Sequence, residues 1–301
     1  MHDEALGAPP QEARMSAGAP PPRSWLFVPA DSNKKMMKAL ASAADAVIFD
    51  LEDSVAPSQK SLARELLGLL PERRDGEPER WVRINPIGSD AHCDDLDILD
   101  DLAIDGVVLP KCESGDDVAD FCAAYAPRSL PVHAIVTETA ASLFGLLSYR
   151  EAGSSLAAMS WGAEDLSAAL GASSKYAASG ELAFTYKLAR SLCLAGAVAA
   201  EVQPVDGVFA DFRDEEGLRA EAESAAREGF TGKLAIHPAQ VPIINAAFTP
   251  SEQDVAHARA IVAAFEAQPD AGVLSVDGKM VDLPHLTQAR RILERASRKE
   301  A

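Results

Sequence analysis

The chain has few cysteines and little positive charge for its length. Only 4 of its 301 residues are cysteine, and no two of them form a CxxC pair. Neither a disulfide framework nor a structural zinc site is therefore indicated. Lys and Arg number 28 against 46 Asp and Glu, which gives a formal net charge of −18. Because nucleic-acid binding needs clustered Lys and Arg to neutralise phosphates, this balance argues against a nucleic-acid partner.

Long apolar runs are also missing. No stretch reaches the roughly 18 consecutive apolar residues of a transmembrane helix, so we expect no membrane partner. Residues 1–22 are rich in Ala, Pro and Gly and lack the apolar core of a signal peptide. We expect this segment to be a disordered tail. Together with the cysteine usage, these absences predict a cytoplasmic protein.

From Arg23 onward the chain alternates short apolar runs with longer helical patterns. Each run is too short for a helix and is followed by a turn or a polar residue, as expected of a buried parallel strand. The eight runs are Trp25–Val28, Ala46–Phe49, Trp81–Ile84, Val107–Leu109, Val132–Val136, Leu156–Trp161, Val205–Phe209 and Leu234–Ile236. Helical stretches between them include Ser32–Ala43, Gln59–Leu70, Asp116–Tyr125 and Glu181–Ala195.

Eight strand–helix pairs predict an α/β fold, the TIM (β/α)₈ barrel, over residues 23–248. A doubly wound sheet is the rival, but no GxGxxG motif follows the first strand. Residues 249–301 predict a C-terminal appendage of helix, hairpin and helix. Thr249-Pro250-Ser251-Glu252 indicates a capping box, with Thr249 as the helix cap and Pro250 as the first helical residue. Asp277-Gly278 indicates a tight primed turn. A last helix is expected over Leu286–Ala296.

Charged residues follow the expected strands at the end where barrel enzymes place their chemistry. Glu52 and Asp53 follow the second strand, Glu138 the fifth and Asp165 the sixth, while Arg83 lies in the third. Clustered carboxylates repel one another unless a cation lies among them. Mg²⁺ prefers oxygen ligands, whereas the lack of a Cys/His cluster disfavours zinc.

These residue types favour one kind of chemistry. A metal ion that holds a 2-keto acid through its oxygens would stabilise an enolate. Arg83 could grip a substrate carboxylate through its planar guanidinium fork. The set suits formation or cleavage of a C–C bond next to a carboxylate.

Seven motifs in the same order resemble the citrate lyase β-subunit-like family of the HpcH/HpaI aldolase superfamily, which includes malyl-CoA and citramalyl-CoA lyases. The resemblance extends from Arg23 to about Leu293. Its motifs are Arg23–Pro29, Phe49–Pro57, Arg83–Pro86, Gly106–Lys111, Gly162–Leu166, Gly232–Pro238 and Asp277–Asp282.

The resemblance implies a Mg²⁺-dependent enzyme that reversibly cleaves a 3-hydroxyacyl-CoA into an acyl-CoA and a 2-keto acid. Glu138 and Asp165 match the family's metal ligands, and Arg83 matches the arginine that binds the substrate carboxylate. Glu52 and Asp53 match an acidic pair beside the site.

Three further residues match positions that contact a neighbouring subunit or coenzyme A in relatives. Asp282 matches a catalytic aspartate donated by a neighbouring subunit, which implies a homo-oligomer, either a trimer or a multiple of it. The plainer interpretation is that Asp282 caps the helix that follows. Lys34 and Lys35 lie in the stretch that contacts CoA phosphates in relatives, or they form only a solvated helix face.

The chain departs from the family pattern at several positions. Ala30 replaces the usual Gly after the first strand, and Ala141-Ser142 replaces an Arg-Gly seen in many members. No histidine follows the second strand, which disfavours the CoA-free 2-keto acid aldolase branch. An acyl-CoA thioesterase, and a citrate-lyase-type subunit that acts on an acyl-carrier protein, remain alternatives.

Overall fold

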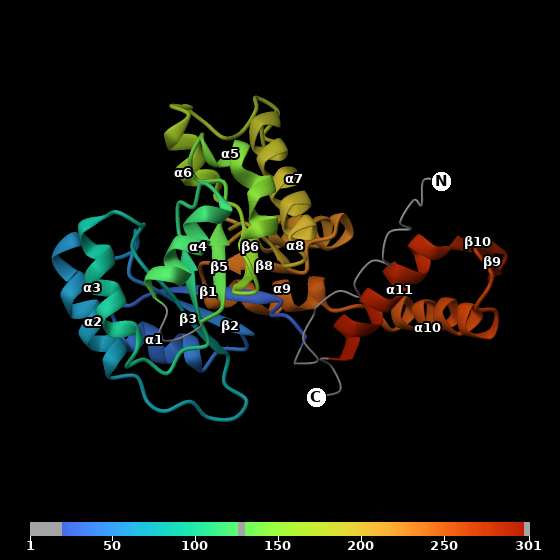
Figure 1. The fold of residues 1–301 in the computed structure, drawn as a ribbon, viewed down its shortest axis with the longest axis horizontal. Helices are drawn as coiled ribbons and strands as arrows, with labels where there is room; N and C mark the ends of the chain where they lie inside the picture. The colour runs from blue at the N-terminus through green and yellow to red at the C-terminus, as the bar shows by residue number, and fades with distance from the viewer. Residues whose placement is uncertain (1–19, 126–129, 298–301) are drawn as a thin grey trace, which may run out of the picture.

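The computed structural model of the chain describes residues 20–125 and 130–297, so nearly all of the predicted tail lies outside the described residues. Eight parallel strands form a closed barrel in chain order, and β1 pairs with β8 to complete the ring (Figure 1). The TIM-barrel prediction is confirmed. The strands are β1 (Ser24–Pro29), β2 (Ala46–Asp50), β3 (Glu79–Arg83), β4 (Gly106–Leu109), β5 (Val132–Ile135), β6 (Leu156–Ser160), β7 (Gln203–Asp206) and β8 (Gly232–Ala235).

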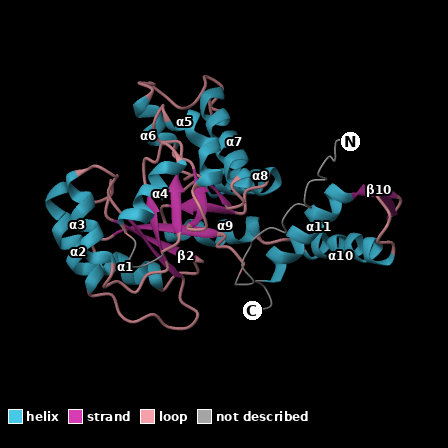
Figure 2. Cartoon of the chain, in the orientation of Figure 1, coloured by secondary structure: helices cyan, strands magenta, loops and turns pink. Residues whose placement is uncertain are grey.

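Helices connect the strands and surround them, as the cyan and magenta elements of Figure 2 show. The α-helices are α1 (Asn33–Leu40), α2 (Lys60–Gly68), α3 (Asp90–Leu99), α4 (Gly115–Ala124), α5 (Ser142–Gly145), α6 (Ala163–Ala169), α7 (Phe184–Ala199), α8 (Glu215–Glu228) and α9 (Val241–Phe248). Short 3₁₀ turns lie at η1 (Pro57–Gln59), η2 (Leu146–Glu151) and η3 (Pro238–Gln240).

The barrel contains two separate apolar clusters. There are two because alternate residues of a strand point to opposite faces of the sheet. On β1, Trp25 belongs to the smaller cluster together with Ile48 and Trp81 from the next two strands. Its neighbour Leu26 belongs to the larger cluster, which also contains Met36 of α1. The barrel therefore has one apolar core inside the ring of strands and another between the strands and the helices. The polar residues that follow the strands are not part of either core.

The seventh strand differs most from its predicted bounds. The apolar run predicts Val205–Phe209, whereas β7 spans Gln203–Asp206 and includes Pro204. Proline has no N–H to donate, so it is a poor strand signal in sequence, yet it pairs here with Met159 of β6. The helix that precedes β7 is also shifted, since α7 spans Phe184–Ala199 rather than Glu181–Ala195.

The C-terminal appendage consists of α10 (Glu252–Ala267), β9 (Val273–Val276), β10 (Lys279–Asp282) and α11 (Leu283–Ala296), and it extends to one side of the barrel (Figure 1). It has a small apolar core of its own, with Ile261, Phe265 and Val281 among its buried side chains. The hairpin turn matches its prediction, because Asp277 and Gly278 both have positive φ, at 50° and 75°.

Two helix starts in the appendage differ from their predictions. The predicted cap at Thr249 is wrong, because α10 begins after Ser251, whose hydroxyl accepts the N–H of Asp254 at 3.1 Å. The Thr249 hydroxyl instead donates to the carbonyl of Asn245 at 2.6 Å and accepts from the guanidinium of Arg23 at 2.7 Å. The last helix begins at Leu283, three residues before its predicted start, with Asp282 as its N-cap.

Candidate active site at the barrel mouth

The floor of the site is an ion pair between two neighbouring strand ends. Asp50 ends β2, Arg83 ends β3, and the two residues are paired in register. The Arg83 guanidinium donates from Nε to Asp50 Oδ1 at 2.7 Å and from Nη2 to Oδ2 at 2.6 Å. Asp50 is only 1% exposed, and burial raises its pKa, but Arg83 outweighs burial and holds the pKa below its usual range. The guanidinium is therefore fixed by a fully buried partner.

The loop after β2 is held from behind by a lysine that the sequence did not indicate. The ammonium of Lys60, in α2, donates to the carbonyls of Leu51 at 2.7 Å and Glu52 at 3.1 Å, and to Asn85 Oδ1 at 2.6 Å. The buried carboxylate of Asp95 accepts both the backbone N–H and the side-chain amide of Asn85. These bonds fix the backbone on which Glu52 and Asp53 lie.

Glu52 is a buried carboxylate between two cations. Its side chain pairs with Arg83 Nη1 at 3.0 Å and with the ammonium of Lys111. Burial raises the pKa of Glu52, and although both cations lower it, the net shift is upward. The oxygen that faces Arg83, Oε2, is buried and forms this ion pair without a well-aligned hydrogen bond among the described residues. Glu52 is 2% exposed, so that oxygen is held out of bulk water.

Lys111 joins acidic residues from three strand ends. It lies two residues past β4 in the left-handed region, with a φ of 54°. Its ammonium contacts Glu52, Asp53 at 3.0 Å and Asp165 at 3.5 Å, and its backbone N–H donates to Glu138 at 2.6 Å. Burial lowers its pKa, but these carboxylates more than offset burial and leave the pKa above its ordinary value.

Glu138 and Asp165 meet as the sequence predicts. Glu138 is 4% exposed, and burial together with the nearby Asp165 carboxylate raises its pKa to about 8. Gly162 leaves the space that Glu138 fills, since a Cβ at Gly162 would lie 2.7 Å from the Glu138 Cγ. A buried carboxyl with a raised pKa beside a second carboxylate is the setting in which a divalent cation is favoured.

The protein would supply few ligands to such a cation. Among the described residues, no group of three or more His, Cys, Asp and Glu side chains is arranged to hold a metal ion. Mg²⁺ keeps several waters and often takes only one or two carboxylates together with substrate oxygens. The pair of Glu138 and Asp165 therefore fits Mg²⁺ and does not fit a closed structural metal site.

The structure does not bring the other predicted residues into this cluster. Asp282 lies in the appendage, where it accepts the backbone N–H of His285 and caps α11. The side-chain bond between Asp282 and His285 lowers the pKa of Asp282. Lys34 and Lys35 are exposed on the first turn of α1, which follows β1.

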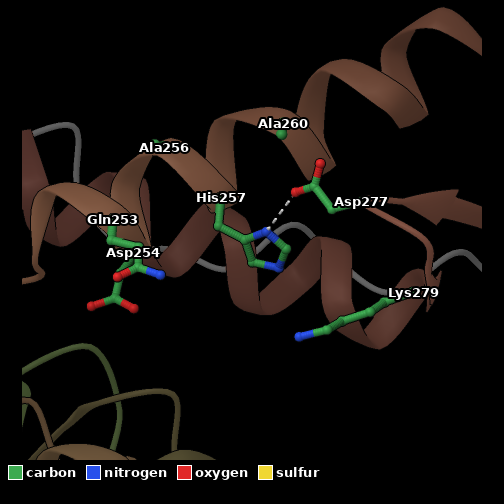
Figure 3. A pocket seen from close by; sticks show the side chains of 7 residues that line it. All are labelled: Gln253, Asp254, Ala256, His257, Ala260, Asp277 and Lys279. Atoms are coloured by element: carbon green, nitrogen blue, oxygen red, sulfur yellow. Dashed lines mark ion pairs between the residues drawn. The ribbon is translucent and has the colours of Figure 1, made fainter.

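A hollow of about 450 Å³ lies in the appendage and not at the barrel mouth. Figure 3 shows it between α10 and the β9–β10 hairpin, with His257 pointing toward Asp277 across 3.7 Å and Lys279 beside them. None of the predicted site residues lines it. The chemistry-bearing residues remain those of the barrel mouth.

A TIM barrel that carries a carboxylate pair and a fixed arginine at the ends of its strands has the arrangement of a barrel enzyme's active site. Residues 23–238 match the family model "HpcH/HpaI aldolase/citrate lyase". The chain belongs to this family, and the expectation of a carbon–carbon lyase or aldolase is confirmed at the level of the family.

Similar proteins cover nearly the whole chain. A citrate lyase subunit beta-like protein of Mycobacterium tuberculosis is 41% identical over 90% of this chain and 94% of its own length. A (3S)-malyl-CoA thioesterase of Cereibacter sphaeroides is 40% identical over 94% of this chain and 97% of its own length. The crystal structure of CitE from M. tuberculosis with magnesium, acetoacetate and coenzyme A superposes with a TM-score of 0.77, at 38% identity, covering 93% of this chain and 99% of that chain.

Within the described residues, every helix is too short or too polar to span a lipid bilayer.

Proposed function

We propose that the protein reversibly cleaves a 3-hydroxyacyl-CoA of the malyl-CoA or citramalyl-CoA type into an acyl-CoA and a 2-keto acid, with Mg²⁺ as its cofactor. The observation that carries this proposal is the meeting of Glu138, Asp165 and Arg83 at one barrel mouth. Magnesium, a keto acid and coenzyme A in the related CitE crystal structure support the same ligand classes.

Glu138 and Asp165 would hold the Mg²⁺ ion. The ion would supply Lewis-acid stabilisation of negative charge on the keto-acid oxygens. Arg83 has five N–H groups, and Asp50 takes two of them through Nε and Nη2. Nη1 also pairs with Glu52 at 3.0 Å, so one remaining N–H on each of Nη1 and Nη2 would orient the substrate carboxylate.

The cleavage moves one proton off the substrate and returns one. The 3-hydroxyl loses its proton, the C2–C3 bond breaks, and its electron pair remains on the acyl-CoA carbon until a proton is added. We assign that proton delivery to Asp282 of a neighbouring subunit, because the appendage extends away from its own barrel (Figure 1). The active enzyme is then a homo-oligomer, a trimer or a multiple of it.

Lys34 and Lys35 are proposed to attract the CoA phosphates. They lie on the first helical turn of α1, which has no acidic side chain, and the helix dipole adds positive potential there. We further place a domain boundary at residue 249, where the barrel elements end. The four free cysteines support a reduced, cytoplasmic setting.

The direct test is to incubate the protein with Mg²⁺, acetyl-CoA or propionyl-CoA, and glyoxylate or pyruvate, and to identify products by mass spectrometry. Malyl-, methylmalyl- and citramalyl-CoA are tested in the reverse direction. We expect an EDTA-sensitive condensation product and turnover without any carrier protein. Turnover that requires an acyl-carrier protein would favour the subunit alternative, and condensation without CoA would favour a 2-keto acid aldolase.

An acyl-CoA thioesterase is the second candidate, and the Cereibacter relative of that name favours it. The two reactions differ in their products. Hydrolysis of malyl-CoA releases malate and free CoA, whereas cleavage releases glyoxylate and acetyl-CoA. Following free thiol and keto acid in the same sample separates them.

A further inference from the structure

Lys111, two residues past β4, contacts every other strand end that contributes a carboxylate to the candidate metal site. Its ammonium contacts Glu52, Asp53 and Asp165, and its backbone N–H donates to Glu138. One residue thus contacts four carboxylates that come from the ends of β2, β5 and β6. Its left-handed backbone is unfavourable for a residue with a Cβ, so local preference does not account for this conformation.

The charges explain what the lysine does there. Asp50, Glu52, Asp53, Glu138 and Asp165 face Arg83 and Lys111, which leaves a formal excess of three negative charges when all are ionised. Arg83 forms its ion pairs with Asp50 and Glu52. Lys111 is therefore the cation among the described residues that contacts Asp165, one of the two proposed metal ligands.

We propose that Lys111 is the resident counter-ion of this cluster, which holds Glu52, Asp53 and Asp165 together without a divalent cation and competes with that cation for Asp165. The inference rests on the proposed function for the identity of the cation. Lys111 acts as a positioning residue: its ammonium releases Asp165 when a divalent ion binds and keeps its pairs with Glu52 and Asp53. Mg²⁺ affinity is thereby set lower than the two carboxylates alone would give.

The test compares Mg²⁺ binding to the full-length protein by titration calorimetry, without substrate, in wild type, Lys111→Met, Lys111→Arg and Lys175→Met. Lys175 pairs with Glu164, next to Asp165 in sequence but outside the cluster, so its loss is a matched control. We expect Lys111→Met to bind Mg²⁺ about tenfold more tightly, because a like charge is removed. Lys111→Arg and Lys175→Met should bind like wild type.

Thermal stability gives a second readout that does not need turnover. In EDTA, Lys111→Met should melt below wild type, and saturating Mg²⁺ should narrow that gap. Where this variant is too unstable to titrate, Glu52→Gln/Lys111→Met removes one charge of each sign and is compared with Glu52→Gln alone. Equal or weaker Mg²⁺ binding without the lysine would overturn the proposal.

The failure of the proposed function has a different signature. If wild type binds no Mg²⁺, the proposed cofactor is wrong, and the counter-ion role is then decided by melting in EDTA. A Lys111→Met variant as stable there as wild type would overturn that role, whereas a loss of stability that Lys111→Arg restores would support it.

Discussion

Arg83 is oriented by two hydrogen bonds to the buried carboxylate of Asp50 and by an ion pair with the buried Glu52, and this makes its shape more important than its charge. Asp50 binds the guanidinium at two points and Glu52 pairs with Nη1, which leaves one N–H group on each of Nη1 and Nη2 for a substrate. A lysine has one compact ammonium and cannot occupy both positions.

We therefore expect Arg83→Lys to lower kcat/KM by about 10- to 100-fold, the effect of losing one or two charged hydrogen bonds. Mg²⁺ affinity should change little, because the proposed metal ligands are untouched. Steady-state kinetics and Mg²⁺ titration of the same preparation check both points. A wild-type kcat/KM in this variant would exclude Arg83 as the carboxylate-binding residue.

The buried His133 on β5 should make the free energy of unfolding depend on pH. Its ring lies edge-on to Trp25, its nitrogens have no hydrogen-bond partner among the described residues, and burial lowers its pKa from 6.5 to about 3. Between those values the unfolded chain binds a proton that the folded protein does not. Stability therefore falls as the pH drops below 6.5, and at pH 5 the loss from this residue is about 2 kcal/mol.

His133→Leu should remove that loss. Urea unfolding of both proteins at pH 7.5 and pH 5 should show the difference in free energy of unfolding shift by about 2 kcal/mol in favour of the variant. Other titrating groups cancel in this comparison. A difference that is the same at both pH values would mean that His133 is not kept neutral in the folded protein.

At the scale of elements, Gly162 in the turn from β6 into α6 has no side chain, and the Glu138 carboxylate occupies the space that a side chain would take. A Cβ at Gly162 would lie 2.7 Å from the Glu138 Cγ and 2.9 Å from its Oε1. Gly162→Ala should displace the carboxylate and weaken Mg²⁺ binding by about tenfold or more, since a hard cation loses an anionic ligand. Gly68→Ala is the matched control, because nothing lies within 4 Å of a Cβ there. Equal Mg²⁺ affinities for the two variants would remove Glu138 from the metal site.

At the scale of the whole molecule, the appendage raises the question of which barrel Asp282 serves. Asp282 also caps α11, so its removal has a structural cost that must be separated from catalysis. Asparagine caps a helix about as well as aspartate does. Asp282→Asn is therefore expected to melt near wild type and yet lose most of its activity.

Mixing of inactive variants tests the shared site. Asp282→Asn and Asp165→Ala oligomers should each be nearly inactive, and mixed oligomers should regain activity because some sites combine two intact halves. Subunit exchange is verified by mass spectrometry of labelled chains. No recovery after exchange, or a fully active monomer, would contradict the shared site.

Much of this protein could be predicted from the order of its residues. The barrel follows from eight apolar runs that alternate with helical patterns, and the hairpin turn follows from Asp277-Gly278. Glu138 and Asp165 could be paired in advance, because parallel strand ends of one barrel meet at one mouth. These features rest on local periodicity and on connectivity, which a sequence carries directly.

Other features required the folded chain. No motif in the sequence distinguishes Lys60 from Lys175, yet Lys60 binds the backbone of the loop after β2 while Lys175 pairs with Glu164. Thr249 looks like a helix cap, but its hydroxyl is taken by Arg23, 226 positions away in the chain. Lys111 reaches Glu52 and Asp165 only after the barrel has closed. Long-range pairing of charges depends on which side chains the packed core brings within a few ångströms, and local sequence does not encode that distance.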